Sequence, residues 1–396
     1  MEVKPGYKKT EVGVIPEEWD AKPLKGRISI AHGFAFSGEH FEDHGPYRLT
    51  TPGHFYEEGG FRDIGEKQKF YDSPVPSDYV LRPGDMIVAM TEQADGLLGS
   101  AAFIPEVQGY LHNQRLGRIN AVSSQVDLGF LFYTFNSLGY RAKVRETAVG
   151  TKVKHASPEK LLEIPVRLPP LPEQRLIAGA LSHVDALLGS LEKLIAKKRD
   201  LKQAAMQQLL TGKKRLPGFS GEWEVKQLGD VATLYQPVMI SASQFTASGY
   251  PVYGANGIVG FFGKFNHDTW QITITCRGST CGTVNRTVEK CWITGNAMVI
   301  NCDRSNWVDK AFIYYLLTFQ DLSICVTGTG QPQIVRSPLA SCELRVPNGI
   351  EEQTAIAEVL SDMDAELAAL EQRLAKTRDL KQGMMQDLLT GRTRLV

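Results

Sequence analysis

A long segment occurs twice in this chain, and this internal repeat restricts the possible folds more than any other feature. Residues 173–216 align without a gap on residues 352–395 at a constant offset of 179, and about 26 of the 44 aligned positions are identical. Glu173 matches Glu352, and Asp185 matches Asp364. Identity at this level indicates a true repeat whose two copies share a structural role.

Both copies have the pattern of a long helix that packs along another helix. Apolar residues recur with alternating steps of four and three, which is an a/d heptad pattern. With no internal proline, and with Gly212 and Gly391 just beyond the pattern, each copy predicts a helix of about 38 residues and roughly 57 Å. We expect the two helices to pack on each other, antiparallel; the alternative is two independent amphipathic helices, each on its own domain. The predicted seam consists of Ile177, Leu181, Val184, Leu188, Leu191, Ile195, Ile356, Leu360, Met363, Leu367, Leu370 and Leu374.

The repeat extends beyond the helices to the whole chain. Trp19 and the residues around it match Trp223 and its neighbours at an offset of 204, which falls to 179 at the helix, so the second unit is about 25 residues shorter. Each half reads as a tryptophan-containing entry, a variable domain, a rigid extended step and a long helix. The predicted segments are a domain at 1–165, a helix at 166–216, a domain at 217–345 and a helix at 346–396. We expect each tryptophan to be a buried anchor.

Charge is unevenly distributed along a chain whose net charge is zero. Lys and Arg minus Asp and Glu gives −4 for residues 1–150, +7 for 151–216, 0 for 217–345 and −3 for 346–396. Opposite net charges on the two helix segments favour pairing between them over self-pairing. The basic groups at 197–199 and 213–215 are candidate phosphate contacts, although exposed helix faces explain them equally well.

Several classes of protein are disfavoured by the sequence. No apolar run has the length of a membrane span and the N-terminus has no signal-peptide core, so we expect a cytoplasmic protein. The six cysteines form no CxxC pair and indicate buried free thiols. His40 and His44 have helical ligand spacing, but HxxxH alone is weak evidence and we predict no metal. Phosphate-loop and dinucleotide fingerprints are missing, and we predict no catalytic residue.

The two variable domains alternate strand and turn signals in the same order. In the first, strands are expected within 79–90 and 99–104, followed by a helix at 128–147 and a basic loop at 150–155. In the second, strands are expected at 250–254, after 271 and after 294, and the loop 328–334 matches the position of the basic loop. Polar turns therefore follow the strands at equivalent places in both domains.

Several longer motifs stand out across both halves of the chain. They are LPPLPEQRLIA at 168–178, the paired RDLKQ…LLTG segments at 199–212 and 378–391, GTKVKHASPEKL at 150–161, and PVYGANGIVG with ITGNAMVI in the second half. With these motifs the chain resembles, over essentially its whole length, the specificity (S, HsdS) subunit of type I restriction–modification enzymes. The segment 347–350 departs from the proline-rich step of the first copy, so the entry to the second helix is expected to be less rigid.

The resemblance implies a fold, a role and partners. The implied fold is α+β, with two pseudo-symmetric mixed α/β target recognition domains joined by two long antiparallel helices that form a coiled coil. Each recognition domain would read one half of a bipartite site in double-stranded DNA, and the helix pair would set the gap. Two modification (HsdM) subunits would dock on the helices and restriction (HsdR) subunits would join them. No cofactor is expected in this chain; S-adenosylmethionine and ATP would bind to the partner subunits.

Amides, hydroxyls and basic side chains in the polar loops are the candidates for reading bases and phosphates. For any one of them, a hydrogen bond inside the domain is an equally good interpretation. In the first domain the candidates are Thr91, Gln93, Asn113, Gln114, Arg115, Lys152, Lys154 and His155. In the second they are Asn256, Arg277, Ser279, Thr280, Asn296, Thr329, Gln331 and Gln333.

Because the two sets differ, we expect two unlike half-sites. Two other classes of function stay open: a fused restriction or methylation enzyme with an unrecognised active site, and a coiled-coil scaffold whose domains bind proteins.

Overall fold

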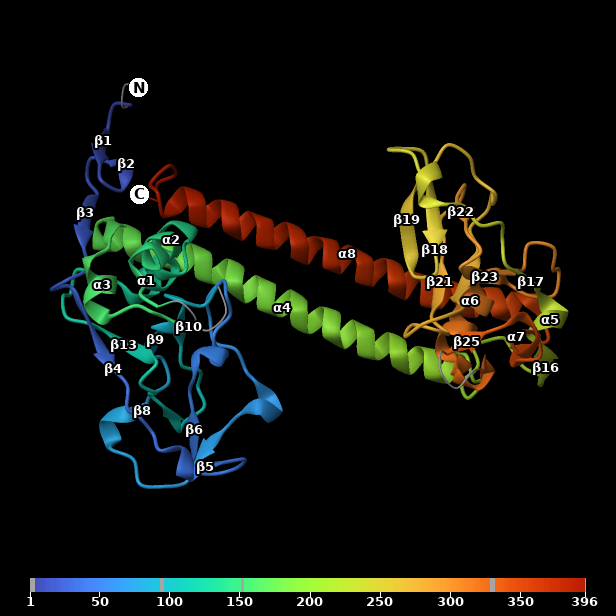
Figure 1. Cartoon of the computed structure of the whole chain (residues 1–396), viewed down its shortest axis with the longest axis horizontal. Coiled ribbons are helices and arrows are strands. Elements are labelled where there is room, and N and C mark those ends of the chain that lie inside the picture. Colours follow the sequence, from blue (N-terminus) through green and yellow to red (C-terminus); the bar gives the residue numbers. More distant parts are fainter. Residues whose placement is uncertain (1–3, 93–95, 151–152, 328–331, 396) are drawn as a thin grey trace. The chain divides into compact units, whose positions relative to one another are not determined.

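The computed structural model describes residues 4–92, 96–150, 153–327 and 332–395. By packing, the chain forms two compact units, residues 1–190 with 374–396 and residues 191–373. Each unit therefore contains one variable domain and part of both long helices (Figure 1). The mixed helix and sheet content confirms the predicted α+β fold.

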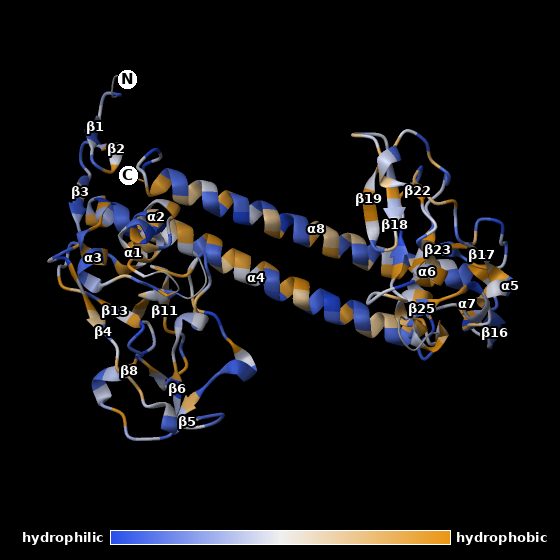
Figure 2. Ribbon diagram, in the orientation of Figure 1, coloured by the Kyte–Doolittle hydropathy of each residue, from blue (hydrophilic) through white to orange (hydrophobic). Residues whose placement is uncertain are grey.

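The two repeated segments form the longest helices of the described chain, α4 (Leu171–Leu209) and α8 (Ile350–Leu388), each of 39 residues. In the first unit the start of α4 lies against the end of α8, where Lys381 pairs with Asp185 at 2.6 Å. In the second unit Lys202 near the end of α4 pairs with Asp364 of α8, and Arg215, beyond α4, pairs with Glu352 at the start of α8 at 2.5 Å. The helices therefore run antiparallel, as predicted. Both alternate hydrophobic and hydrophilic residues along their length (Figure 2).

The twelve predicted seam residues are all buried or half-buried in the structure. Ile177 and Leu181 join the hydrophobic core of the first unit, and Ile356 and Leu360 join that of the second. Charge complementarity adds to this packing in the second unit, where Lys198 pairs with Glu366 and Arg199 with Glu371. These basic residues thus contact α8, which favours the helix-pairing interpretation over phosphate contact at Lys198 and Arg199.

The first unit is built on a four-stranded antiparallel sheet of order β11-β9-β13-β4. Its strands are Ala101–Phe103, Met86–Ala89, Leu116–Ala121 and Ile28–His32. A mixed sheet of order β5-β7-β6-β12-β8 comprises Phe41–Glu42, Phe70–Tyr71, Tyr47–Leu49, Tyr110–Leu111 and Val80–Leu81. Short pairs are β1 with β2 (Tyr7–Thr10, Gly13–Pro16), β3 with β15 (Asp20–Pro23, Pro165–Leu168) and β10 with β14 (Thr91–Glu92, Lys154–His155).

Three short helices complete this unit: α1 (Leu128–Phe135), α2 (Leu138–Thr147) and α3 (Pro158–Glu163). The single helix predicted at 128–147 is wrong, because the chain breaks at Asn136 and Ser137. Asn136 turns its side chain back to the carbonyl of Phe132 and also bonds Ala101, while Ser137 caps α2 through the N–H of Tyr140. Local side-chain hydrogen bonds of this kind compete with helix continuation.

The second unit repeats the plan with a four-stranded antiparallel sheet of order β17-β23-β20-β21. Its strands are Thr233–Tyr235, Ala297–Asn301, Ile272–Thr275 and Val284–Arg286. The other pairings are β19-β18-β22 (Gly257–Phe262, Tyr250–Gly254, Trp292–Ile293), β16 with β26 (Trp223–Gln227, Glu343–Pro347) and β24 with β25 (Val326–Thr327, Gln333–Ile334). Its short helices are α5 (Leu228–Val231), α6 (Lys310–Phe319) and α7 (Arg336–Ala340).

The four-stranded sheets of the two units have the same strand order and the same register. Leu116 pairs with Ala89 in the first unit, and Ala297 pairs with Thr275 in the second. On this alignment β9 corresponds to β20, β13 to β23, β4 to β17 and β11 to β21. The internal repeat therefore covers the sheets of the variable domains as well as the helices.

Each entry tryptophan is buried, as predicted, and lies beside a repeated ion pair. Glu173 accepts hydrogen bonds from the indole of Trp19 at 2.9 Å and from Arg394 at 2.6 Å. In the second unit Glu352 pairs with Arg215, whose guanidinium lies 5.9 Å from the Trp223 ring. These contacts attach the start of β3 in the first domain and of β16 in the second to the ends of the long helices.

Candidate nucleic-acid interface

Several predicted residues of the first unit gather where strand β9 ends. Met90 follows that strand, and its N–H donates to the carbonyl of Arg115 at 3.0 Å, while its carbonyl accepts from Ala156 at 2.9 Å. Thr91 is the register partner of His155 in the β10–β14 pair. Backbone hydrogen bonds therefore bring Thr91, Arg115 and His155 together from three distant parts of the sequence. Arg115 and His155 are exposed, and Thr91 is half-buried.

The segment 96–98 is held by two charged residues that the sequence interpretation missed. The carboxylate of Glu92 is buried and accepts N–H groups of Gly96, Leu97 and Leu98 at 3.1, 2.8 and 2.7 Å. From the other side, Arg141 donates to the carbonyls of Gly96 and Leu98. Burial lowers the pKa of the Arg141 guanidinium to about 10.

These two residues position the loop, and Lys154 lies 3.9 Å from the second carboxylate oxygen of Glu92. The sequence signal was a lone acidic residue directly after a buried strand, a pattern too common to interpret by itself.

The turn at 113–115 presents two exposed polar side chains and buries a third. Asn113 is buried, and its side-chain oxygen accepts the N–H of Arg115 at 3.0 Å, which shapes the turn. Gln114 and Arg115 are exposed at the surface. Asn113 therefore has a structural contact, and its predicted DNA contact stays a prediction.

In the second unit, the predicted residues gather at the end of β20, the strand equivalent to β9. Arg277 forms a β-bridge with Gln333, flanked by hydrogen bonds from Ile334 to Cys276 at 2.9 Å and from Gly278 to Pro332 at 3.3 Å. Arg277 and Ser279 are exposed and Gln333 is half-buried. The bridge joins the loop after β20 to the loop that the sequence had aligned with the basic loop of the first domain.

Asn256, Thr280 and Asn296 lie around the same strand end. The side-chain oxygen of Asn256 is 2.8 Å from the hydroxyl of Thr280 and 3.0 Å from that of buried Thr275, the last residue of β20. Asn296 is exposed and directly precedes Ala297, the register partner of Thr275. The predicted residues of this domain that the structure describes therefore form one cluster.

The two clusters are equivalent at three positions. The sheet registers place Arg277 where the first unit has Thr91, Gln333 where it has His155, and Asn296 where it has Arg115. At these matching positions the first unit has a hydroxyl, an imidazole and a guanidinium. The second unit has a guanidinium and two amides in the same order. Of the predicted residues, Gln93, Lys152, Thr329 and Gln331 lie outside the described residues.

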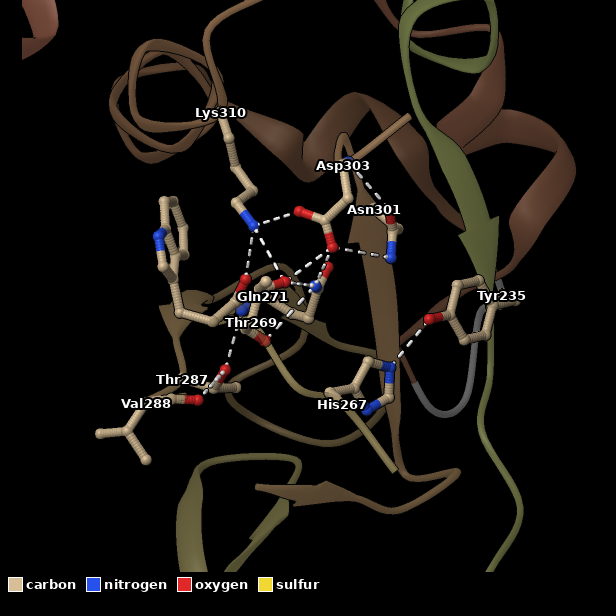
Figure 3. Close-up of polar contacts among 10 residues, drawn as sticks. Tyr235, His267, Thr269, Gln271, Thr287, Val288, Asn301, Asp303 and Lys310 are labelled. Carbon is tan, nitrogen blue, oxygen red and sulfur yellow. Dashed lines mark hydrogen bonds and ion pairs between the residues drawn. The ribbon is translucent and has the colours of Figure 1, made fainter. Parts of the chain in front are cut away.

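A polar network lies at the other end of β20 from the second cluster, where Gln271 precedes the strand and Asp303 follows β23 (Figure 3). Asp303 accepts from Thr269 and Gln271, both at 2.7 Å, and pairs with Lys310 at the start of α6. Burial acts to raise the pKa of this carboxyl, but the hydrogen bonds from Lys310, Thr269 and Gln271 together lower it below its ordinary value. Asp303 therefore connects the segment leading into β20 to helix α6.

The structure does not support a metal site at His40 and His44. His40 ends a short 3₁₀ turn (Gly38–His40) and His44 lies beyond strand β5, so the two do not share a helix face. Among residues 4–92, 96–150, 153–327 and 332–395, no group of three or more His, Cys, Asp or Glu side chains is arranged to hold a metal ion.

All six cysteines are free, and five of them are buried. No helix in the described part of the chain combines the length and apolarity needed to cross a membrane.

Comparison with known proteins gives consistent matches. The family model described as the type I restriction modification DNA specificity domain matches residues 16–199 and 220–377. A putative type I restriction enzyme MjaX specificity subunit from Methanocaldococcus jannaschii is 24% identical over 98% of this chain and 97% of that protein. The MjaVIII specificity subunit of the same organism is 28% identical over 54% of this chain, which spans 50% of that relative's length.

Solved structures show the same fold. The S subunit of a type I restriction–modification system from M. genitalium matches with a TM-score of 0.66 at 15% identity, covering 98% of each chain. The repeat, the two equivalent clusters and the family match over most of the sequence lead to one conclusion: this chain belongs to the type I restriction modification DNA specificity family.

Proposed function

We propose that this chain is the DNA-reading subunit of a type I restriction–modification complex and that each unit reads one half of an asymmetric bipartite site. The single observation that carries the proposal is the equivalence of the two clusters. In both units polar side chains surround the end of the same strand, yet the side chains at matching positions differ. A shared frame with unlike donors and acceptors suits two recognition domains that read different bases.

The long helices would set the gap between half-sites and dock two modification (HsdM) subunits, with restriction (HsdR) subunits joining the complex. Relatives of this chain are specificity subunits by name. We propose that the chain itself contributes no catalytic residue and no cofactor, with S-adenosylmethionine and ATP bound by the partners in the cytoplasm. The buried ion pairs attach each domain to the helix ends, which supports the proposed role of the helices.

Arg277→Ala tests the proposal at one residue. If Arg277 contacts a guanine, about 1–3 kcal/mol of discrimination should disappear at one base pair of one half-site. The measurement is competition binding by the complex assembled with modification subunits, using duplexes that vary at each position of the mapped target. Thr91→Ala is the matched variant in the other unit and should affect the other half-site only. Equal weakening on every sequence would reassign Arg277 to phosphate contact.

Two experiments separate the competing classes of function. Calorimetry in which the purified chain alone binds S-adenosylmethionine would support a fused enzyme and contradict the proposal. Affinity for the mapped duplex should fall steeply with rising salt because phosphate contacts release counterions. A protein-binding scaffold would show no such binding.

A further inference from the structure

Each unit exposes apolar side chains directly beside its polar cluster. Residues 31–36, from the end of β4 onward, and residues 235–240, from the end of β17 onward, share the same sequence of exposed and buried positions at the offset of 204. Both end on a buried apolar residue, Phe36 or Ile240. Between sheet and anchor, Phe34 is 39% exposed, Val238 76% and Met239 61%.

In the first unit the segment is held against the turn at 113–115. The N–H of Phe34 donates to the carbonyl of His112 at 2.8 Å, and its carbonyl accepts from Gln114 at 3.0 Å. Gly33 permits this approach, because a Cβ atom there would lie 2.1 Å from the carbonyl oxygen of Asn113. The Phe34 ring packs at 5.1 Å against the rings of both Phe36 and Tyr79. The ring is therefore braced beside the exposed side chains of Gln114 and Arg115.

In the second unit the equivalent segment is held against the turn at 294–296. The hydroxyl of Thr294 lies 3.6 Å from the sulfur of Met239, and a Cβ atom on Gly295 would lie 2.6 Å from the carbonyl oxygen of Pro237. Val238 and Met239 are thus fixed next to Asn296, as Phe34 is fixed next to Arg115.

The start of this segment is anchored by Tyr235, whose hydroxyl lies 2.8 Å from Nε2 of His267 (Figure 3). The side-chain oxygen of Asn266 accepts the N–H of Ile293, and its side-chain nitrogen donates to the carbonyl of Ile293. These two bonds set the orientation of the Asn266 amide. Its oxygen then accepts from Nδ1 of His267 at 2.6 Å, so Nε2 accepts the proton of the Tyr235 hydroxyl. The hydrogen bond from Tyr235 to His267 holds one end of the segment, and the buried side chain of Ile240 holds the other.

We propose that Phe34 in the first unit, and Val238 with Met239 in the second, are specificity-determining residues that contact thymine C5-methyl groups beside the bases read by the adjacent turns. The inference rests on the proposed function. Apolar side chains in the major groove recognise thymine by contact with its methyl group. Insertion between bases is less suitable here, because Val238 is short and the Phe34 ring is braced by two other rings.

The experiment uses the complex of this chain with modification subunits. Its methylated motif is first mapped by single-molecule sequencing. Duplexes of that motif are then made in which each thymine in turn is replaced by deoxyuridine, which lacks only the C5-methyl group. Loss of one buried methyl contact should weaken binding about fourfold. We expect such a position in each half-site for the wild-type complex.

The variants locate the contacts. Phe34→Ala should abolish the uracil effect in one half-site only, and the double variant Val238→Ala with Met239→Ala should abolish it in the other. Phe34→Leu keeps an apolar side chain and should retain the effect. A half-site without thymine, no uracil effect in the wild type, or an effect that survives unchanged in the alanine variants would overturn this inference. Absence of any methylated motif would instead contradict the proposed function, so the two failures are distinguishable.

Discussion

Glu173 is the residue whose environment most clearly links the domains to the helices. Its side chain is 2% exposed and is bonded by Arg394 from the segment after α8 and by Trp19 from the first domain. A carboxylate buried this deeply requires such partners, because an unpaired charge is costly to remove from water. The repeat places Glu352 and Arg215 in the same relation in the second unit.

Removing Arg394 should therefore destabilise the first unit. We expect Arg394→Ala to lower the free energy of unfolding by about 3 kcal/mol, because a buried carboxylate would lose its charged partner. Denaturant unfolding of the full chain measures this. The matched control is Arg199→Ala, whose pair with Glu371 is exposed and should contribute about 1 kcal/mol or less. Equal effects of the two variants would contradict the interpretation.

His112 makes the first unit sensitive to acid. Burial lowers the pKa of its imidazole to about 4, and Nε2 donates to the carbonyl of Leu116 at 3.0 Å. The imidazole of the unfolded chain binds a proton near pH 6.5, whereas the folded chain binds it only near pH 4. The free energy of unfolding should therefore be highest above pH 6.5 and fall by about 3 kcal/mol as the pH falls toward 4. We expect His112→Gln, whose amide can still donate to Leu116, to flatten this part of the stability curve. An unchanged dependence of the free energy of unfolding on pH would contradict this prediction.

Among the elements, the β10–β14 pair depends on the backbone conformation at Gly150. Gly150 has φ of +117°, which favours glycine, and a Cβ atom there would lie 2.0 Å from the carbonyl oxygen of Val153. Beside it, Val149 and His155 exchange backbone hydrogen bonds at 3.0 and 2.9 Å. The placement of His155 beside Thr91 therefore depends on a single backbone position.

Gly150→Ala should impair one half of the recognition surface while leaving the core folded. We expect at least a tenfold loss of affinity for the mapped duplex, since an alanine at this φ costs about 1–3 kcal/mol and the turn must move. The midpoint of thermal unfolding should fall by several degrees at most, because the strain is local and the core packing is unchanged. The control is Gly139→Ala in α2, where a Cβ atom meets nothing within 4 Å. Normal affinity with Gly150→Ala would show that the turn does not shape the interface.

At the scale of the whole molecule, the antiparallel helix pair predicts a spacer whose length can be changed without altering either reading surface. Inserting seven residues after Ser190 and seven after Lys376 adds one heptad to each helix and preserves the apolar seam. The added length is about 10.5 Å, which corresponds to roughly three base pairs. We expect the gap between half-sites to lengthen while the half-site bases stay the same, as read by methylation mapping. Altered half-site bases with an unchanged gap would contradict the spacer hypothesis.

The sequence alone was sufficient for the elements whose pattern repeats. The heptad seam, the two helix ends near Gly212 and Gly391, and the buried Trp19 and Trp223 follow from spacing, since a long amphipathic helix must bury its apolar face. The break at Asn136 was missed although its cause is partly local: Asn136 bonds the carbonyl of Phe132 and Ser137 caps α2, and only the bond to Ala101 is long-range.

Only the tertiary structure decided which loops meet. Thr91 pairs with His155, and Arg277 with Gln333, through strands separated by dozens of residues. Local propensity carries no information about such pairings, because their stability comes from sheet registers set by the packing of each unit. For the same reason Asn113 could not be distinguished in sequence from its neighbour Arg115, although one side chain is buried in the turn and the other faces solvent. The repeat thus determined that two equivalent clusters should exist, and the folded sheets determined which side chains each contains.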